Sequence, residues 1–442
     1  MRKQILFLSQ SLPFPPHSGV TNRTYHILQE LQREHDVTLV AFSRRNHQPD
    51  AAGREGAAAA LRREISNVMH PVPLKSEWSI ASKLLNHGLS VLTREPYIFY
   101  EYGNQAFGDQ LGRAVDQVSP DLVHLDSMDL YRWLDRIPPV PTACTHHNLE
   151  SELLRLRGEH IPSRLVGAYV EHQAKLVENV ERRLTPQFDL NVMTSVRDAE
   201  RLRALAGEVR THVTPNGVDV EYFRPTPPAE VVPGRVTFLG PTYMFPNRDA
   251  TDFFLAEAWP SIRRGCRDSS FHLIGKNSPA EKARFESYPS VACHGYVADI
   301  RPYFAETACS VVPLRVGGGT RLKILDAWAM GKAIVSTSIG CEGLETVDGT
   351  NILIRDDPKE FAEAVVDVLR DDKLRYNLGH EARKTAERCY AWPVVGRELN
   401  AKYKQLLAGA PAELSHSVPS DNSAISPRES ATPYSLPALT PR

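Results

Sequence analysis

The chain has 442 residues, more than one hydrophobic core usually holds, so we expect two or three domains. Its composition is 42% hydrophobic and 24% charged with a formal net charge of −1, as in water-soluble globular proteins. The balanced charge argues against an electrostatic nucleic-acid binder. No stretch reaches the roughly 20 apolar residues that a membrane-spanning helix needs.

Short apolar runs alternate with longer helical runs along the chain. The expected strands are Ile5–Leu8, Asp36–Phe42, Leu122–Leu125, Thr142–Thr145, Asn191–Thr194, Arg235–Leu239, Phe271–Ile274, Ala308–Pro313, Ala333–Ser336 and Asn351–Ile354. The expected helices are Thr21–Arg33, Leu176–Leu184, Arg197–Ala206, Arg248–Ile262, Arg301–Phe304, Arg321–Met330 and Lys359–Leu369. This alternation predicts an α/β fold with parallel, doubly wound sheets covered on both faces.

A proline-rich stretch divides the series once, after Asp219 and before Arg235. Proline at that density cannot lie inside a sheet or a helix, so we expect a linker there. The predicted organisation is an N-terminal Rossmann-like domain over 1–215, a linker over 216–234, a C-terminal Rossmann-like domain over 235–388, a helix over 389–408 that crosses back to the first domain, and a disordered tail over 409–442. A cleft between the two domains is the expected ligand site, because open α/β sheets bind ligands at the carboxyl ends of their strands.

Residues 43–110 are less regular and contain an amphipathic run, Trp78–Leu92, followed by several aromatic residues. Two interpretations are open. The one we favour is a helical insertion that packs its apolar stripe inward. The other is an acceptor-side element or a peripheral membrane contact through 78–102.

The six cysteines are scattered and include no Cys-x-x-Cys pair, so we expect them to be reduced and buried. The apolar run near the N-terminus is too short for a signal peptide and is expected to form the first strand. These features favour a cytoplasmic protein, with at most a peripheral contact at the inner face of the membrane.

A glycine-rich turn, Gly317-Gly318-Gly319, separates an expected strand from an expected helix. Glycines let backbone amides approach an anion, and a helix N-terminus adds free N–H groups and the positive end of a dipole. Thr320 is expected to be the N-cap, and Arg321 and Lys323 supply cations where a diphosphate would lie. Asp326 would reach a ribose or sugar hydroxyl. The alternative is a plain turn with a surface i,i+3 ion pair between Lys323 and Asp326.

The residues after this turn, Asp326-Ala327-Trp328-Ala329-Met330-Gly331-Lys332-Ala333-Ile334-Val335, resemble a motif of the family 4 glycosyltransferases. In that family the motif reads Glu-Ala-Met-Ala-x-Gly followed by Pro-Val-Val. The family often has a first glutamate eight positions earlier, where this chain has Gly318, and the second acid is here the shorter Asp326. The paired-glutamate form is therefore absent.

Other pieces of the chain match the same family in order and spacing. Thr214-Pro215-Asn216-Gly217-Val218-Asp219 is similar to its domain junction, and the strand before Gly240 is similar to the start of its second domain. The family often places an arginine and a lysine after that glycine, where this chain has Pro241 and Asn247, so Arg321 and Lys323 would be the main diphosphate cations. Gly275 and Val297 lie in turns that resemble those framing the nucleotide base. Gly19, after the first strand, stands where the family has a glycine facing the donor phosphate, and Arg23 would reach the same cleft or lie exposed on its helix.

His146 and His147 follow an expected strand, at the edge where ligands collect. Relatives with His-Asn-x-Glu at this place suggest that His147 contacts the sugar or the β-phosphate, with His146 as the weaker candidate. The alternative is a structural histidine.

The resemblance implies a GT-B fold and a retaining, metal-independent transfer of a sugar from a nucleoside diphosphate sugar, such as a UDP-sugar. The acceptor would be a saccharide or lipid-linked hydroxyl, in polysaccharide or glycoconjugate assembly, without a cofactor. No Asp-x-Asp or His/Cys cluster has metal-ligand spacing. Two alternatives are a nucleotide-sugar 2-epimerase of the same fold and a non-catalytic nucleotide-sugar binder. A dinucleotide dehydrogenase is disfavoured, because no Gly-x-Gly-x-x-Gly follows the first strand.

Overall fold

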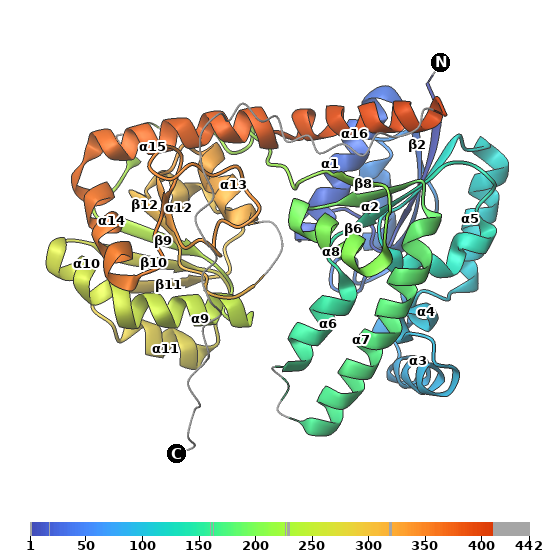
Figure 1. The fold of residues 1–442 in the computed structure, drawn as a ribbon, viewed down its shortest axis with the longest axis horizontal. Helices are drawn as coiled ribbons and strands as arrows, with labels where there is room; N and C mark the ends of the chain where they lie inside the picture. Colours follow the sequence, from blue (N-terminus) through green and yellow to red (C-terminus); the bar gives the residue numbers. More distant parts are fainter. Residues whose placement is uncertain are drawn as a thin grey trace. The chain divides into compact units, whose positions relative to one another are not determined.

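The computed structural model describes residues 2–16, 18–159, 161, 163–225, 227, 230–317 and 321–409 (Figure 1). The predicted disordered tail, except for Gly409, lies outside these residues. The described part of the chain contains two parallel β-sheets with helices around them, which confirms the predicted α/β class.

All strand pairs of the first sheet are parallel. Its order is β3 (Asn67–Val68), β2 (Asp36–Ser43), β1 (Gln4–Ser9), β5 (Leu122–Leu125), β6 (Thr142–His146), β7 (Leu190–Met193) and β8 (Thr211–Val213), and β4 (Val72–Pro73) also pairs with β2. The chain reverses direction across the sheet between β1 and β5, so the ends of these two strands form its switch point.

The second sheet is also parallel throughout. Its order is β11 (Val291–Gly295), β10 (Ser270–Ile274), β9 (Arg235–Leu239), β12 (Cys309–Val312), β13 (Ile334–Ser336) and β14 (Leu353–Ile354). This is the strand order of a Rossmann fold, with its switch point between β9 and β12.

Helices pack on both sheets. Those of the first half are α1 (Gly19–Glu34), α2 (Ala51–Leu61), α3 (Ile80–Thr93), α4 (Tyr97–Glu101), α5 (Gln105–Val118), α6 (Glu150–Glu159), α7 (Arg164–Leu184) and α8 (Val196–Ala206). Those of the second half are α9 (Phe245–Phe253), α10 (Trp259–Gly265), α11 (Pro279–Glu286), α12 (Arg301–Ala305), α13 (Leu322–Ala329), α14 (Pro358–Arg370), α15 (Asp372–Thr385) and α16 (Trp392–Leu407). A π-helical segment, Phe254–Ala258, joins α9 to α10.

Alternation along β1 explains why this strand needs cover on both faces. Ile5 and Phe7 belong to a core with α1 and α16, whereas Leu6 and Leu8 belong to a separate core with α5. All four side chains are fully buried. Because successive side chains of a strand point to opposite faces, an apolar run of this length is stable only between two layers of helices.

The last helix returns to the first half of the chain: α16 packs against α1 (Figure 1). Gly396 lies directly against the side chain of Glu30, with no room for a Cβ, and Asn400 Nδ2 donates to Glu30 O at 2.9 Å. Tyr403 is fully buried in the first half.

The chain passes between the two halves at two places, and these two passages pair with each other. Val218 N donates to Tyr390 O at 2.7 Å, and Trp392 N lies 3.4 Å from Val218 O. The side chain of Arg23, on α1, anchors the first of these two crossing segments, because its guanidinium donates to Thr214 O (2.7 Å) and Pro215 O (2.9 Å). Arg23 is therefore buried in the junction, which corrects both sequence-based interpretations of it.

The prediction of an inward apolar stripe for the segment Trp78–Leu92 is wrong. Helix α3 leaves Ile80, Leu84, Leu85, Val91 and Leu92 exposed, and its buried side carries polar residues. Within the described part of the chain, no helix is long and apolar enough to cross a membrane. All six cysteines are free thiols, and two of them, Cys266 and Cys389, are only half-buried rather than buried as expected.

Candidate functional site

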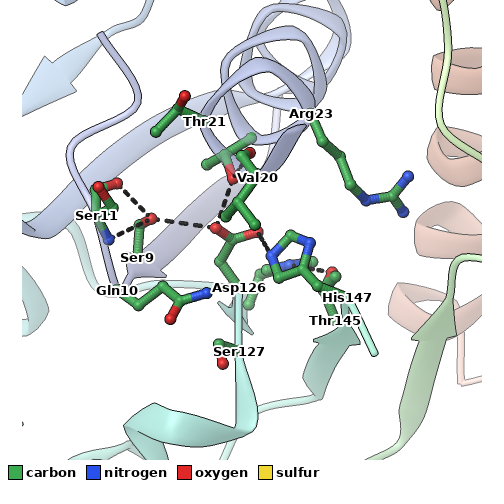
Figure 2. Close-up of polar contacts among 12 residues, drawn as sticks. Ser9, Gln10, Ser11, Val20, Thr21, Arg23, Asp126, Ser127, Thr145 and His147 are labelled. Carbon is green, nitrogen blue, oxygen red and sulfur yellow. Dashed lines mark hydrogen bonds and ion pairs between the residues drawn. The ribbon is translucent and has the colours of Figure 1, made fainter. Parts of the chain in front are cut away.

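Three polar residues meet at the carboxyl edge of the first sheet, at its switch point (Figure 2). Ser9 ends β1, Asp126 follows β5, and His147 follows β6. The Ser9 hydroxyl lies 3.1 Å from Asp126 Oδ2, and Thr24 Oγ1 donates to the same oxygen at 2.7 Å. His147 Nε2 lies 3.5 Å from Asp126 Oδ1.

Asp126 is buried at the centre of this group, with 2% of its surface exposed. Burial alone would raise its pKa, but the imidazole of His147 and the hydroxyl of Thr24 outweigh burial and keep the pKa of Asp126 below its usual value. Asp126 is therefore a buried carboxylate beside the imidazole of His147. The separation of 3.5 Å is long for a hydrogen bond.

The two adjacent histidines have different surroundings. His146 is buried inside the sheet, where its Nε2 lies 2.9 Å from Asn191 Oδ1, and burial lowers its pKa to about 4. These are the contacts of a structural residue. His147 lies at the edge of the sheet with 7% of its side chain exposed, and its carbonyl accepts from Thr194 Oγ1 at 3.4 Å.

Helix α1 begins beside this group, after the loop from β1. Ser18 is its N-cap and forms a capping box with Thr21, which fixes where the helix starts. Gly19 is the first helical residue, and a Cβ added to it would lie 3.5 Å from Leu322 Cδ1. The start of α1 thus approaches the start of α13, which carries the cationic residues described below.

The carboxyl edge of the second sheet is built from close backbone contacts. Gly275 follows β10 with a φ of 139°, and a Cβ there would lie 2.6 Å from the backbone of Gly240 and Pro241. Only glycine fits such an approach. Val297 lies in the next turn, after β11, and is half-buried. The predicted donor residues Gly240, Gly275 and Val297 thus follow three neighbouring strands, β9, β10 and β11.

Arg321 stands directly before α13 and is buried. Its Nη2 donates to Gly317 O at 3.0 Å and to Ile339 O at 3.1 Å, so it ties the turn after β12 to the segment after β13. Burial lowers the pKa of Arg321, while Glu342 opposes this shift.

Lys323 lies one residue into α13 and is held by two uncharged groups. Its Nζ donates to Asn247 Oδ1 at 2.8 Å and lies 4.4 Å from the centre of the Phe238 ring. Burial and the nearby charge of Arg321 lower the pKa of Lys323 to about 7. Among the described residues, no carboxylate lies within 4.0 Å of this ammonium. The alternative of a surface ion pair with Asp326 is therefore wrong.

Asp326 is half-buried one turn further along α13, and burial raises its pKa to about 7. A carboxyl group with that pKa can accept hydrogen bonds from hydroxyls when ionised and donate one when protonated.

The helix begins one residue later than predicted, with Arg321 rather than Thr320 at the N-cap. Gly318, Gly319 and Thr320 lie outside the described residues, so the predicted anion contacts of this turn rest on Gly317 and on α13. The described residues contain no group of three or more His, Cys, Asp or Glu side chains placed to hold a metal ion.

Sequence reasoning did not single out Asp126, Asn247 as the partner of Lys323, or Phe238. A signal for Asp126 existed: it is an acid directly after a buried strand, at the edge where ligands bind. Asn247 had been noted only as the residue that stands where the family often has a lysine. Its contact with Lys323 joins residues 76 positions apart.

Two family models cover most of the chain. The model described as Glycosyltransferase Family 4 matches residues 17–222, and the model described as Glycosyl transferases group 1 matches residues 233–371. The boundary between the two matches coincides with the proline-rich stretch. No sequence among curated proteins matches this chain.

Solved structures similar to this chain share its two-sheet architecture. HepE of Anabaena in complex with UDP is 14% identical with a TM-score of 0.61, covering 92% of this chain and all of HepE. A sucrose-phosphate synthase from Thermosynechococcus elongatus is 15% identical with a TM-score of 0.64, covering 92% of this chain and 100% of that one. A glycosyltransferase from Rickettsia africae is 13% identical with a TM-score of 0.61, covering 93% and 100%.

Proposed function

Because this chain is a family 4 glycosyltransferase with the GT-B fold, we propose that it transfers a sugar from a UDP-sugar or related nucleoside diphosphate sugar to an acceptor hydroxyl, with retention and without a metal. UDP is the nucleotide in the solved HepE complex. The acceptor would be a saccharide or a lipid-linked saccharide of polysaccharide or glycoconjugate assembly, on the cytoplasmic side of the membrane.

The observation that carries this proposal is the position of Lys323. A half-buried ammonium whose described partners are an amide and an aromatic ring, beside a buried guanidinium, can bind an anion without first giving up a carboxylate. It lies after β12, at the switch point of the second sheet, where open α/β sheets bind nucleotides. A diphosphate there would gain two charge-assisted contacts.

The same cations suit the departure of the leaving group. As the bond from the anomeric carbon to the diphosphate breaks, negative charge grows on the phosphate oxygens. Lys323 and Arg321 are already oriented before this charge appears, so their reorganisation energy is small. In the retaining reaction the acceptor oxygen attacks from the face of the leaving group, and its proton passes to a diphosphate oxygen.

The pair Asp126–His147 would act from the first sheet. The imidazole of His147 would hydrogen-bond a sugar hydroxyl or the β-phosphate, and Asp126 lies beside it to hold its orientation. Asp326, on α13, would bind a ribose hydroxyl in place of the family's glutamate.

Incubation of the full chain with a panel of UDP- and GDP-sugars tests the proposal. Thermal shift first identifies the donor, since a ligand selective for the native state raises its stability by mass action. The donor is then supplied with membrane and saccharide extracts, and the product is analysed by NMR for the anomeric configuration.

We expect transfer with retention, lost in Lys323→Met. Turnover of the UDP-sugar without acceptor would indicate an epimerase instead. Nucleotide binding with no turnover in any extract would indicate a non-catalytic binder.

A further inference from the structure

Helix α3 packs its polar face against the protein and exposes its apolar face, the opposite of a helix that covers a hydrophobic core. At a spacing of 100° per residue, Ile80, Leu84, Leu85, Val91 and Leu92 fall on one half of its surface, together with Ala81 and Gly88. The opposite half carries Ser82, Lys83, Asn86, His87, Ser90 and Thr93, with Leu89 at its edge. Figure 1 shows α3 at the periphery of the first half, beside α7 and α4.

The polar half of α3 is the one that packs against the protein. His87 Nδ1 lies 2.6 Å from the hydroxyl of Tyr169 on α7, and Gln173 Nε2, also on α7, donates to Ser90 Oγ at 2.8 Å. Gln173 Oε1 in turn accepts from the backbone of Tyr97 at 3.0 Å. These bonds fix the rotation of α3, so its apolar half must face outward.

The outward half is well exposed. Ile80 and Leu92 are 79% and 81% exposed, and the remaining large aliphatic side chains of this half, Leu84, Leu85 and Val91, are all more than half exposed. At the start of the neighbouring α7, Leu165 is 86% exposed, one turn before Tyr169. Soluble proteins rarely leave a contiguous aliphatic surface of this kind uncovered.

The exposed charged side chains of residues 75–101 are all cations, whereas Glu77, Glu95 and Glu101 are half-buried. Lys75, Lys83 and Arg94 are exposed at the rim of this surface, and none of them has a described carboxylate within 4.0 Å. The two acids at the ends of the helix are turned to the protein: Glu77 Oε2 accepts from the backbone of Arg45 at 2.6 Å, and Glu95 Oε2 accepts from the hydroxyl of Tyr131 at 3.2 Å.

We propose that the outward half of α3, with Leu165 and the rim cations, is a docking surface for an anionic lipid bilayer. This face of α3 is aliphatic, has lysine and arginine at its rim and is flanked by Trp78. These are the features of an amphipathic helix that lies in the membrane interface. A protein interface would favour aromatic residues and disfavour lysine. The surface deepens the proposed function, because it would bring the enzyme to a lipid-linked acceptor.

The test is binding of the full chain to vesicles of zwitterionic lipid alone and to vesicles of the same lipid mixed with an anionic lipid. We expect sedimentation with the anionic vesicles. The variant Leu84→Glu/Val91→Glu should bind them on the order of a hundredfold more weakly. Lys75→Gln/Lys83→Gln should weaken binding about twentyfold and reduce its dependence on salt, because Arg94 remains.

A matched control is available in the second half of the chain. Val347 and Tyr376 are 56% and 63% exposed, close to Val91 and Leu84 at 57% and 67%. The variant Val347→Glu/Tyr376→Glu adds the same two charges and should bind vesicles like the wild type. Circular dichroism of each variant shows whether α3 and the fold are kept.

Equal binding by the α3 and control variants would overturn the proposal, and so would a wild type that does not sediment. A wild type that is a dimer, and becomes monomeric in Leu84→Glu/Val91→Glu, would assign this surface to a second copy of the chain instead. UDP binding is measured in the same preparations. A wild type that binds anionic vesicles but does not bind UDP would refute the donor site and still support the membrane surface. The failures of the two proposals are therefore distinguishable.

Discussion

Replacing Lys323 by methionine should make the protein more stable and its nucleotide binding weaker. The pKa of Lys323 is about 7 in the folded chain against 10.5 for a free lysine. At about 1.4 kcal/mol per tenfold change in proton affinity, this sets an upper limit of about 5 kcal/mol on the penalty for the charged amine. Because part of the side chain still meets water, we expect a gain of about 2 kcal/mol in the free energy of unfolding at pH 6.

The sign of the pH dependence follows from proton counting. Since the folded pKa is the lower one, the unfolded chain binds an extra proton between pH 7 and 10.5, so the wild type gains stability as pH rises through this window. Methionine removes the group, so the advantage of Lys323→Met is complete below pH 7 and vanishes towards pH 10.5. Urea unfolding of both proteins at pH 6, 8 and 10 measures this difference.

Nucleotide binding should change in the opposite direction. Loss of a charged hydrogen-bond donor is worth about 1.5–3 kcal/mol, so calorimetry should show UDP bound about a hundredfold more weakly. Asn247→Leu serves as the companion variant, because it removes the acceptor that orients Lys323 at 2.8 Å and keeps the cation. It should weaken UDP binding by about tenfold. If Lys323→Met lowered stability at pH 6 and left UDP binding unchanged, the reasoning about an uncompensated cation would be refuted.

Two further variants test the supporting parts of the site. Asp126→Asn keeps the shape of the side chain but removes the charge next to His147, so kcat should fall about a hundredfold with UDP affinity unchanged. The control is Asp121→Asn, at the other end of β5, which should leave kcat intact. Equal losses of kcat in both variants would contradict a role of Asp126 at the site. Gly275→Ala would place a Cβ 2.6 Å from backbone atoms at a φ of 139°, so the free energy of unfolding should drop by about 3 kcal/mol or more in urea titrations, and an unchanged midpoint would count against the close approach.

Most of the fold could be predicted from the sequence because its strands are buried on both faces. A run such as Ile5–Leu8 has no polar position, and only a parallel sheet between two helical layers accommodates it. Three short strands of the first sheet, β3, β4 and β8, escaped prediction because they have two or three residues each, too few for a period to be visible. The start of α7 was placed twelve residues too late, at Leu176 rather than Arg164.

Sequence reasoning selected His147 and Lys323 because each lies in the segment that follows the carboxyl end of a strand. The site was not predictable where a partner comes from far along the chain. Sequence periodicity shows that α3 is amphipathic, but the residues that decide which half faces inward, Tyr169 and Gln173, lie more than 80 positions away. The same holds for Arg23, whose partners around residue 215 lie more than 190 positions away.

The paired passages at Val218 and Tyr390–Trp392 limit how the two halves of the chain can move. Two backbones joined side by side by hydrogen bonds behave as a ribbon, which bends readily across its flat face and resists bending within its plane. Arg23 and the packing of α16 on α1 clamp one end of this ribbon to the first half. The motion that opens the site to the donor should therefore be a hinge rotation about one axis. Gly19 and Leu322 would separate during this rotation and return to the same contact in each catalytic cycle.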